Sequence, residues 1–183
     1  MNRSHSVKNR TLAAVSLGIA APVAVLAGCS SSTTLDSAKL NTQIVDQINQ
    51  VAPNSNPTVS CPSDVKAEAN ATFTCTATVA GQEMQLTVTQ KDADGNVSYQ
   101  GDSSIFQLAS TQEKLSAKVA ESQPGTWTTA CNPTGAQQGY YIAKPGTTFD
   151  CEVSGTAADG TAKTGTLAVT VTDADGNVSL AFK

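Results

Sequence analysis

Five cysteines and two pairs of aspartates are the side chains in this 183-residue sequence whose types and spacing could support chemistry. The cysteines could form disulfides, bind a metal or act as nucleophiles. Neighbouring carboxylates could act as an acid and base pair, or could bind calcium. Histidine, a frequent partner in such sites, occurs once, as His5. The cysteines are Cys29, Cys61, Cys75, Cys131 and Cys151, and the aspartate pairs are Asp92 with Asp94 and Asp173 with Asp175.

The first cysteine ends a segment with the layout of an export signal. Three basic residues precede an apolar stretch over 11–27, which is short for a membrane span. This stretch runs into LAGC at 26–29, which resembles the lipobox of bacterial lipoproteins. The resemblance implies that the Cys29 thiol receives a diacylglycerol, that further acyl chains such as palmitate anchor the protein, and that cleavage removes residues 1–28. An ordinary signal peptide with an unrelated cysteine is the alternative. Residues 29–34 would then be the lipidated cysteine and a Ser/Thr tether.

Charge argues against some partners of the mature chain. Loss of residues 1–28 removes three of eleven basic residues and no acidic one, so the formal net charge moves from −4 to −7. This balance disfavours nucleic acid and anionic lipid surfaces as partners. We therefore expect the membrane to hold the protein through acyl chains on Cys29, at the extracytoplasmic face of the cell membrane.

A repeat organises the rest of the sequence. The letters DADGNVS stand at 92–98 and again at 173–179, and a pair of cysteines precedes each copy. The second copy has about six extra residues between its cysteines. Two tandem units follow from this alignment, over 35–102 and 103–183. Cores of this size are marginal, which favours disulfides as added support.

The repeat also bears on how the cysteines pair. With Cys29 taken by the lipid, four cysteines remain in a chain expected to meet oxidising conditions. The repeat favours Cys61 with Cys75 and Cys131 with Cys151, and a crossed pairing is the alternative. A metal site is less favoured, because there is no C-x-x-C and the single histidine lies in the signal peptide.

Periodicity predicts the same elements in each unit. In the first unit, apolar residues recur at spacings of four, four and three, which is one face of a helix. In the second, Ser110 precedes Glu113 by three, a capping-box pattern that predicts a helix start ahead of Leu115 and Val119. Period-two alternation after each helix predicts strands with one buried face. The helix set is Leu40, Ile44, Ile48 and Val51, and the strands are expected near 58–61, 72–79, 84–88, 97–99, 128–131, 149–153, 167–171 and 178–182.

The sequence therefore predicts an α+β fold of two tandem units. Each unit would have an N-terminal helix packed on a three- to four-stranded antiparallel sheet, with one disulfide. DADGNVS would be the hairpin turn between the last two strands, because Asp-Gly tolerates the positive φ of tight turns. Calcium is the alternative for these aspartates, but an EF-hand loop needs glycine at its sixth position, and here glycine is fourth.

Some of these residues resemble a known family. CPSDV at 61–65, ATFTCTA at 71–77 and DADGNV at 92–97 resemble the domain-of-unknown-function 4333 family of actinobacterial envelope lipoproteins. The second copy is divergent, with CNP at 131–133 in place of Cys-Pro. The resemblance implies an exported or membrane-anchored actinobacterial protein and implies no activity. In layout alone, the tandem disulfide-bonded units are similar to beta-lactamase inhibitory protein.

Aromatic residues concentrate in the second unit and suggest a contact loop. Trp127, Tyr140, Tyr141 and Phe149 are four of the eight aromatic residues, and glycines and prolines lie among them. On an exposed loop, Trp127, Tyr140 and Tyr141 would be anchors for a partner. The alternative is that Trp127 and Phe149 belong to the core and one tyrosine covers the sheet edge.

The sequence favours binding over catalysis. The mature chain has no histidine, and no nucleophile elbow, phosphate loop or dinucleotide fingerprint occurs. We expect no enzyme, no cofactor and no metal, and a binding or scaffolding role in the bacterial cell envelope. The partner would be a protein, a glycan or a lipid, and not a nucleic acid. The alternative is a proteinaceous enzyme inhibitor.

Overall fold

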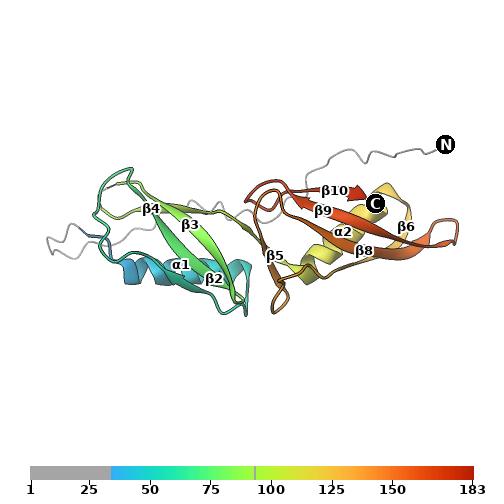
Figure 1. Ribbon diagram of the computed structural model, residues 1–183, viewed down its shortest axis with the longest axis horizontal. Coiled ribbons are helices and arrows are strands. Elements are labelled where there is room, and N and C mark those ends of the chain that lie inside the picture. Colours follow the sequence, from blue (N-terminus) through green and yellow to red (C-terminus); the bar gives the residue numbers. More distant parts are fainter. Residues whose placement is uncertain (1–33, 93) are drawn as a thin grey trace. The chain divides into compact units, whose positions relative to one another are not determined.

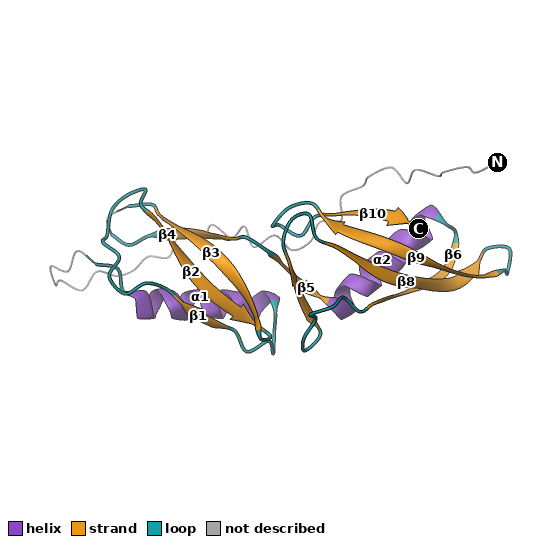
Figure 2. Ribbon diagram, viewed as in Figure 1, coloured by secondary structure: helices purple, strands orange, loops and turns teal. Residues whose placement is uncertain are grey.

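The computed structural model describes residues 34–92 and 94–183 (Figure 1). The predicted signal peptide and Cys29 lie outside the described residues. The described chain divides into two compact units, which hold residues 34–103 and 104–183. Both contain a helix and antiparallel strands, so the α+β class is confirmed (Figure 2).

The helix of the first unit packs with the apolar face that its sequence predicts. Helix α1 spans Ser37–Val51, and the side chain of its N-cap residue Asp36 accepts a hydrogen bond of 3.0 Å from the Lys39 amide. This bond satisfies one of the amides that a helix start leaves without a partner. Leu40, Ile44 and Ile48 of the predicted face are buried. The helix lies beside β1 and covers one face of the sheet.

The first sheet has the order β1-β2-β3-β4, and all its pairs are antiparallel. Alternation buries Cys75, Ala77 and Val79 on β2 and leaves four threonines of the strand on the other face. On β3, the buried residues are Met84, Leu86, Val88 and Gln90. The strands are β1 Thr58–Ser60, β2 Thr72–Val79, β3 Gln82–Gln90 and β4 Val97–Gly101.

A buried glutamine fixes the long connection between β1 and β2. The side chain of Gln90 is fully buried, and its Nε2 donates to the Lys66 carbonyl at 2.9 Å. Its Oε1 accepts from the Glu68 amide at 3.0 Å. The same connection receives the start of the described chain, because the Leu35 amide donates to the Val65 carbonyl at 2.8 Å. One polar side chain thus orders a segment with little apolar burial of its own.

The second unit contains a four-stranded and a two-stranded antiparallel sheet. The larger has the order β10-β9-β8-β6, and the smaller pairs β5 with β7. Helix α2 packs against β6, and its Leu115 and Val119 enter a core with Phe149, Leu167 and Val169. The elements are β5 Ser104–Gln107, α2 Leu108–Ser122, β6 Gly125–Cys131, β7 Tyr140–Ala143, β8 Thr148–Ala157, β9 Ala162–Val171 and β10 Val178–Phe182.

The predicted start of the second helix is wrong. Helix α2 begins at Leu108, after an N-cap residue, Gln107, whose side chain makes no capping bond, so Ser110 lies inside the first turn. Strand β5 runs directly into the helix, and the Leu108 amide donates to the Gly139 carbonyl at 2.8 Å. A backbone group about thirty residues away therefore replaces the expected side-chain cap.

Candidate binding surface

The four described cysteines form the two disulfides that the repeat favours. Cys61 is bonded to Cys75, and Cys131 to Cys151. Cys131 lies directly opposite Cys151 in the β6–β8 register, and both side chains are buried. These sulfurs therefore close loops across neighbouring strands and offer no thiolate for catalysis or metal binding.

The two aspartate pairs organise hairpin loops, as the turn prediction has it. Asp173 Oδ1 accepts from the amides of Asp175 and Asn177, both at 3.0 Å, and its Oδ2 accepts from the Asn177 side chain at 2.7 Å. Asp92 makes the equivalent bonds to Asp94 and Asn96. The asparagine side chain, followed by the loop amides, holds the pKa of each first aspartate below its ordinary value.

This geometry uses the aspartate oxygens within the loop. Each loop connects the last two strands of a sheet, and Gly95 and Gly176 supply the positive φ that it needs, at 88° and 83°. Among residues 34–92 and 94–183, no group of three or more His, Cys, Asp or Glu side chains is placed to hold a metal ion.

The three aromatic residues expected on a contact loop lie in strands. Trp127 stands on β6 with 9% of its surface exposed, and its Nε1 donates to the Gln123 carbonyl at 2.7 Å. Tyr140 stands on β7 and is 4% exposed. Tyr141 is half-buried and meets Phe149 edge to face, with ring centroids 5.4 Å apart.

The contact-loop interpretation is therefore wrong for Trp127 and Tyr140, and the core alternative holds for Trp127 and Phe149. The reason is that Tyr140–Ala143 pairs with Ser104–Gln107 and becomes strand β7. Strand pairing satisfies its backbone, so its aromatic side chains can be buried.

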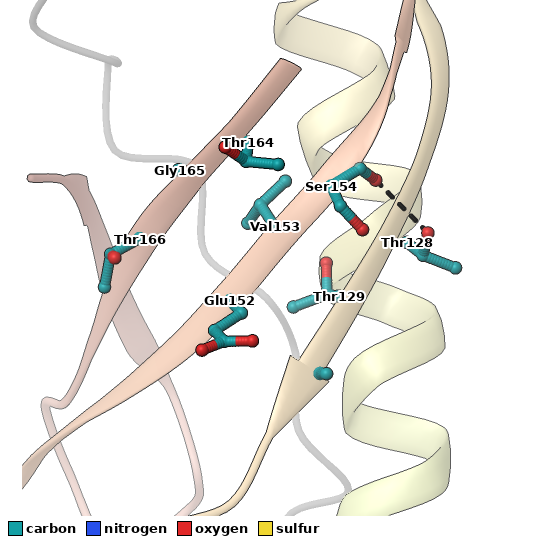
Figure 3. A pocket seen from close by; sticks show the side chains of 9 residues that line it. Thr128, Thr129, Glu152, Val153, Ser154, Thr164, Gly165 and Thr166 are labelled. Atoms are coloured by element: carbon teal, nitrogen blue, oxygen red, sulfur yellow. Dashed lines mark hydrogen bonds between the residues drawn. The ribbon is translucent and has the colours of Figure 1, made fainter. Parts of the chain in front are cut away.

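A different surface of the second unit is hollowed. A depression of about 490 Å³ lies over β6, β8 and β9 (Figure 3). Three rows of the register form it, and the outer two rows consist of Thr128, Ser154 and Thr164, and of Ala130, Glu152 and Thr166. The middle row is Thr129, Val153 and Gly165.

Alternation shows which face is hollowed. Thr129 and Val153 are buried with the core, on the face that α2 covers. Residues one position away along each strand point to the opposite face. Those of the outer two rows are exposed or half-exposed, and Figure 3 shows α2 behind the strands. The hollow therefore opens on the sheet face that the helix leaves uncovered.

The chemistry of the hollow is that of hydroxyl groups and one carboxylate. Thr128, Ser154, Thr164 and Thr166 bring hydroxyls, each able to donate and accept. The Thr128 hydroxyl already donates to the Ser154 carbonyl at 3.2 Å. Glu152 is exposed and is the single ionisable residue among the nine that line the hollow. The site can form hydrogen bonds with a polar ligand and attracts cations over anions.

This hollow is not among the sites expected from the sequence. The sequence pattern that could have indicated it is the run of polar residues at alternate positions of three strands. Period-two alternation places these residues on one face of the sheet. The hollow also depends on the pairing of β6 with β8 and of β8 with β9, which joins residues far apart in the sequence. A single strand does not reveal that pairing.

Comparison with known proteins finds one family model that matches part of the chain. Searches of the curated proteins and of the solved structures found no match. Among the described residues, neither helix has the length and apolar character to cross a membrane. The model of the family described as Domain of unknown function (DUF4333) matches residues 18–95, a span that includes α1, β1, β2 and β3. Over these residues, the chain is similar to the DUF4333 family.

Proposed function

We propose that this protein is a lipid-anchored, non-catalytic binding protein on the extracytoplasmic face of a bacterial cell membrane. The export signal and the lipobox-like LAGC at 26–29 support the anchor at Cys29. The two disulfides support an oxidising compartment. The family match adds no activity, because the function of its domain is unknown.

The two units are diverged copies of one domain in this proposal. In both four-stranded sheets, one edge strand ends at or just before the first cysteine, and the other edge strand begins within DADGNVS. In each, the disulfide joins the edge strand or its end to the next strand. The second copy differs in its inserted β7 and in the lengths of β8 and β9.

The observation that carries the binding role is the polar hollow on the second sheet. Its volume lies in the range of ligand sites, about 300 to 1,000 Å³. No aromatic side chain lines it for stacking on a sugar ring, and Glu152 disfavours the phosphate of a lipid headgroup. Hydroxyls that donate and accept match the amides of a polypeptide. We therefore assign an envelope protein as the partner, with a polar or cationic segment in the hollow.

Site-specific photocrosslinking in intact cells tests this assignment. A photoreactive residue at Ser154 of the full-length protein lies within the hollow and should capture a protein adduct. Thr78 is the matched control, because it stands three residues after Cys75 as Ser154 stands three after Cys151, on a sheet face of the first unit. Equal adducts from both positions, or a protease-resistant adduct at Ser154, would contradict the proposal. The alternative function, that of an enzyme inhibitor, stays a prediction. An assay for enzyme inhibition at a stoichiometric ratio would test it.

A further inference from the structure

Strand β10 forms an edge of its sheet and lacks, within the strand, the features that commonly prevent an edge strand from pairing with another chain. Among the described residues, β10 pairs only with β9. Edge strands of monomeric proteins commonly carry a charge, a proline or a bulge that prevents pairing with another chain. Residues 177–182 read NVSLAF and include neither a charged residue nor a proline. All five residues of β10 pair in continuous register with β9.

The backbone of β10 presents hydrogen-bonding groups along this edge. The Lys183 amide donates to the Thr166 carbonyl at 3.0 Å, and the Thr172 amide donates to the Asn177 carbonyl at 2.8 Å. The odd-numbered residues therefore bond toward β9. Because an antiparallel strand alternates the two directions, Val178, Leu180 and Phe182 direct their N–H and C=O groups outward.

The same three residues form an apolar stripe. Their side chains share one face of the sheet, since they are two positions apart. Val178 and Leu180 are half-buried against the core of the second unit. Phe182 is 38% exposed and is the one large hydrophobic side chain classed as exposed among the described residues. The edge thus offers both backbone partners and apolar surface.

We propose that β10 pairs antiparallel with β10 of a second copy of this chain. Centred on Leu180, the pairing places Leu180 opposite itself and Val178 opposite Phe182 of the other copy. Ser179 then faces Ala181 on the other side of the sheet. Each rung is apolar with apolar or small with small, and no like charges meet. A twofold interface requires such self-complementarity, and it joins the two four-stranded sheets into one.

Residues at the ends of the strand are compatible with this register. Lys183 would stand opposite Asn177 of the other copy. The Lys183 ammonium is 2.5 Å from the Asp150 carboxylate of its own chain, and the Asn177 amide donates to Asp173. Lys183 therefore brings no unpaired charge to the interface, and the Asn177 side chain already has a hydrogen-bond partner.

The corresponding strand of the first unit lacks the stripe. Aligned on DADGNVS, Leu180 corresponds to Tyr99 and Phe182 to Gly101. Tyr99 donates its hydroxyl hydrogen to Gln47 of α1, so this side chain is engaged within its own unit. Gly101 has no side chain to contribute. The proposal therefore concerns β10 alone and does not depend on the occupant of the hollow.

Charge substitution at the twofold position tests the register. The mature acylated protein in detergent is examined by native mass spectrometry over a range of concentrations, with circular dichroism to verify folding. Wild type should be dimeric, and Leu180→Lys and Leu180→Glu should each be monomeric because like charges would face each other. An equal mixture of the two variants should restore a dimer that contains one copy of each.

Two further variants keep the test decisive if Leu180 substitutions unfold the unit. Phe182→Lys changes a largely exposed side chain and should also give monomers, whereas Gln100→Lys at the exposed position of β4 should leave the dimer intact. A wild type that is monomeric at every concentration overturns the proposal. So does a dimer that survives Phe182→Lys, or folded Leu180 variants that do not recombine in the mixture.

Discussion

The Gln90 side chain should hold the β1–β2 connection in place, and Gln90→Leu should release it. The substitution keeps a side chain of similar size in a fully buried position but removes the bonds to the Lys66 carbonyl and the Glu68 amide. A typical intramolecular hydrogen bond contributes a net 0.5 to 1.5 kcal/mol, so two bonds give roughly 1 to 3 kcal/mol. Lys66 and Glu68 are exposed, so water can satisfy their freed backbone groups, which favours the lower half of this range.

Amide hydrogen exchange measures this effect where it occurs. The Glu68 amide should exchange slowly in wild type and about 5- to 30-fold faster in Gln90→Leu, since about 1 to 2 kcal/mol is lost and 1.4 kcal/mol corresponds to a factor of ten. Urea unfolding followed by circular dichroism should show the matching loss of free energy of unfolding. Gln85→Leu is the control, because Gln85 is exposed on the same strand and its change should stay within about 0.5 kcal/mol. Unchanged protection of the Glu68 amide in Gln90→Leu would refute the reasoning.

Three further predictions concern charge and covalent links. The pKa of Asp173 is lowered in the fold, so its stabilisation should be complete above its unfolded pKa of about 3.9 and lost as pH falls through the folded value. Asn177→Ala should raise that pKa in an NMR titration, and an unchanged value would contradict the assigned cause. Loss of the disulfide in a Cys131→Ser, Cys151→Ser double variant should cost about 3 kcal/mol in urea unfolding, given a separation of 20 residues; an unchanged midpoint would contradict the estimate. Burial raises the pKa of Tyr99 to about 12, so its stabilisation should be present below pH 10 and lost between about pH 10 and 12. Ultraviolet titration would measure this, and ionisation near pH 10 would contradict it.

Elements defined by local pattern could be predicted from the sequence. The apolar face of α1 and the alternation of β8 follow from spacing within one segment, and the confirmed helix and strand bury those residues. The loops at Asp92 and Asp173 are also local, because their hydrogen bonds join residues two to four positions apart. Such structure needs no information from the rest of the chain.

Elements defined by distant partners were missed. Strands β5 and β7 have four residues each, too few for a clear period, and each exists because it pairs with the other. Leu108 begins a helix because the Gly139 carbonyl accepts its amide hydrogen. The hollow likewise needs three strands in register. These features depend on non-local pairing, which spacing within one segment does not specify.

The positions of the cysteines allow each disulfide to form only when the strands are paired in the correct register. Cys131 stands opposite Cys151, and the Ser60–Thr76 rung places Cys61 next to Cys75 in the same way. A slip of one residue would turn one cysteine of a pair to the opposite face and exchange the threonine face with the apolar face. The sulfurs could then no longer meet. During oxidation, each sheet can therefore be locked only after its strands have found the alignment that separates core from surface.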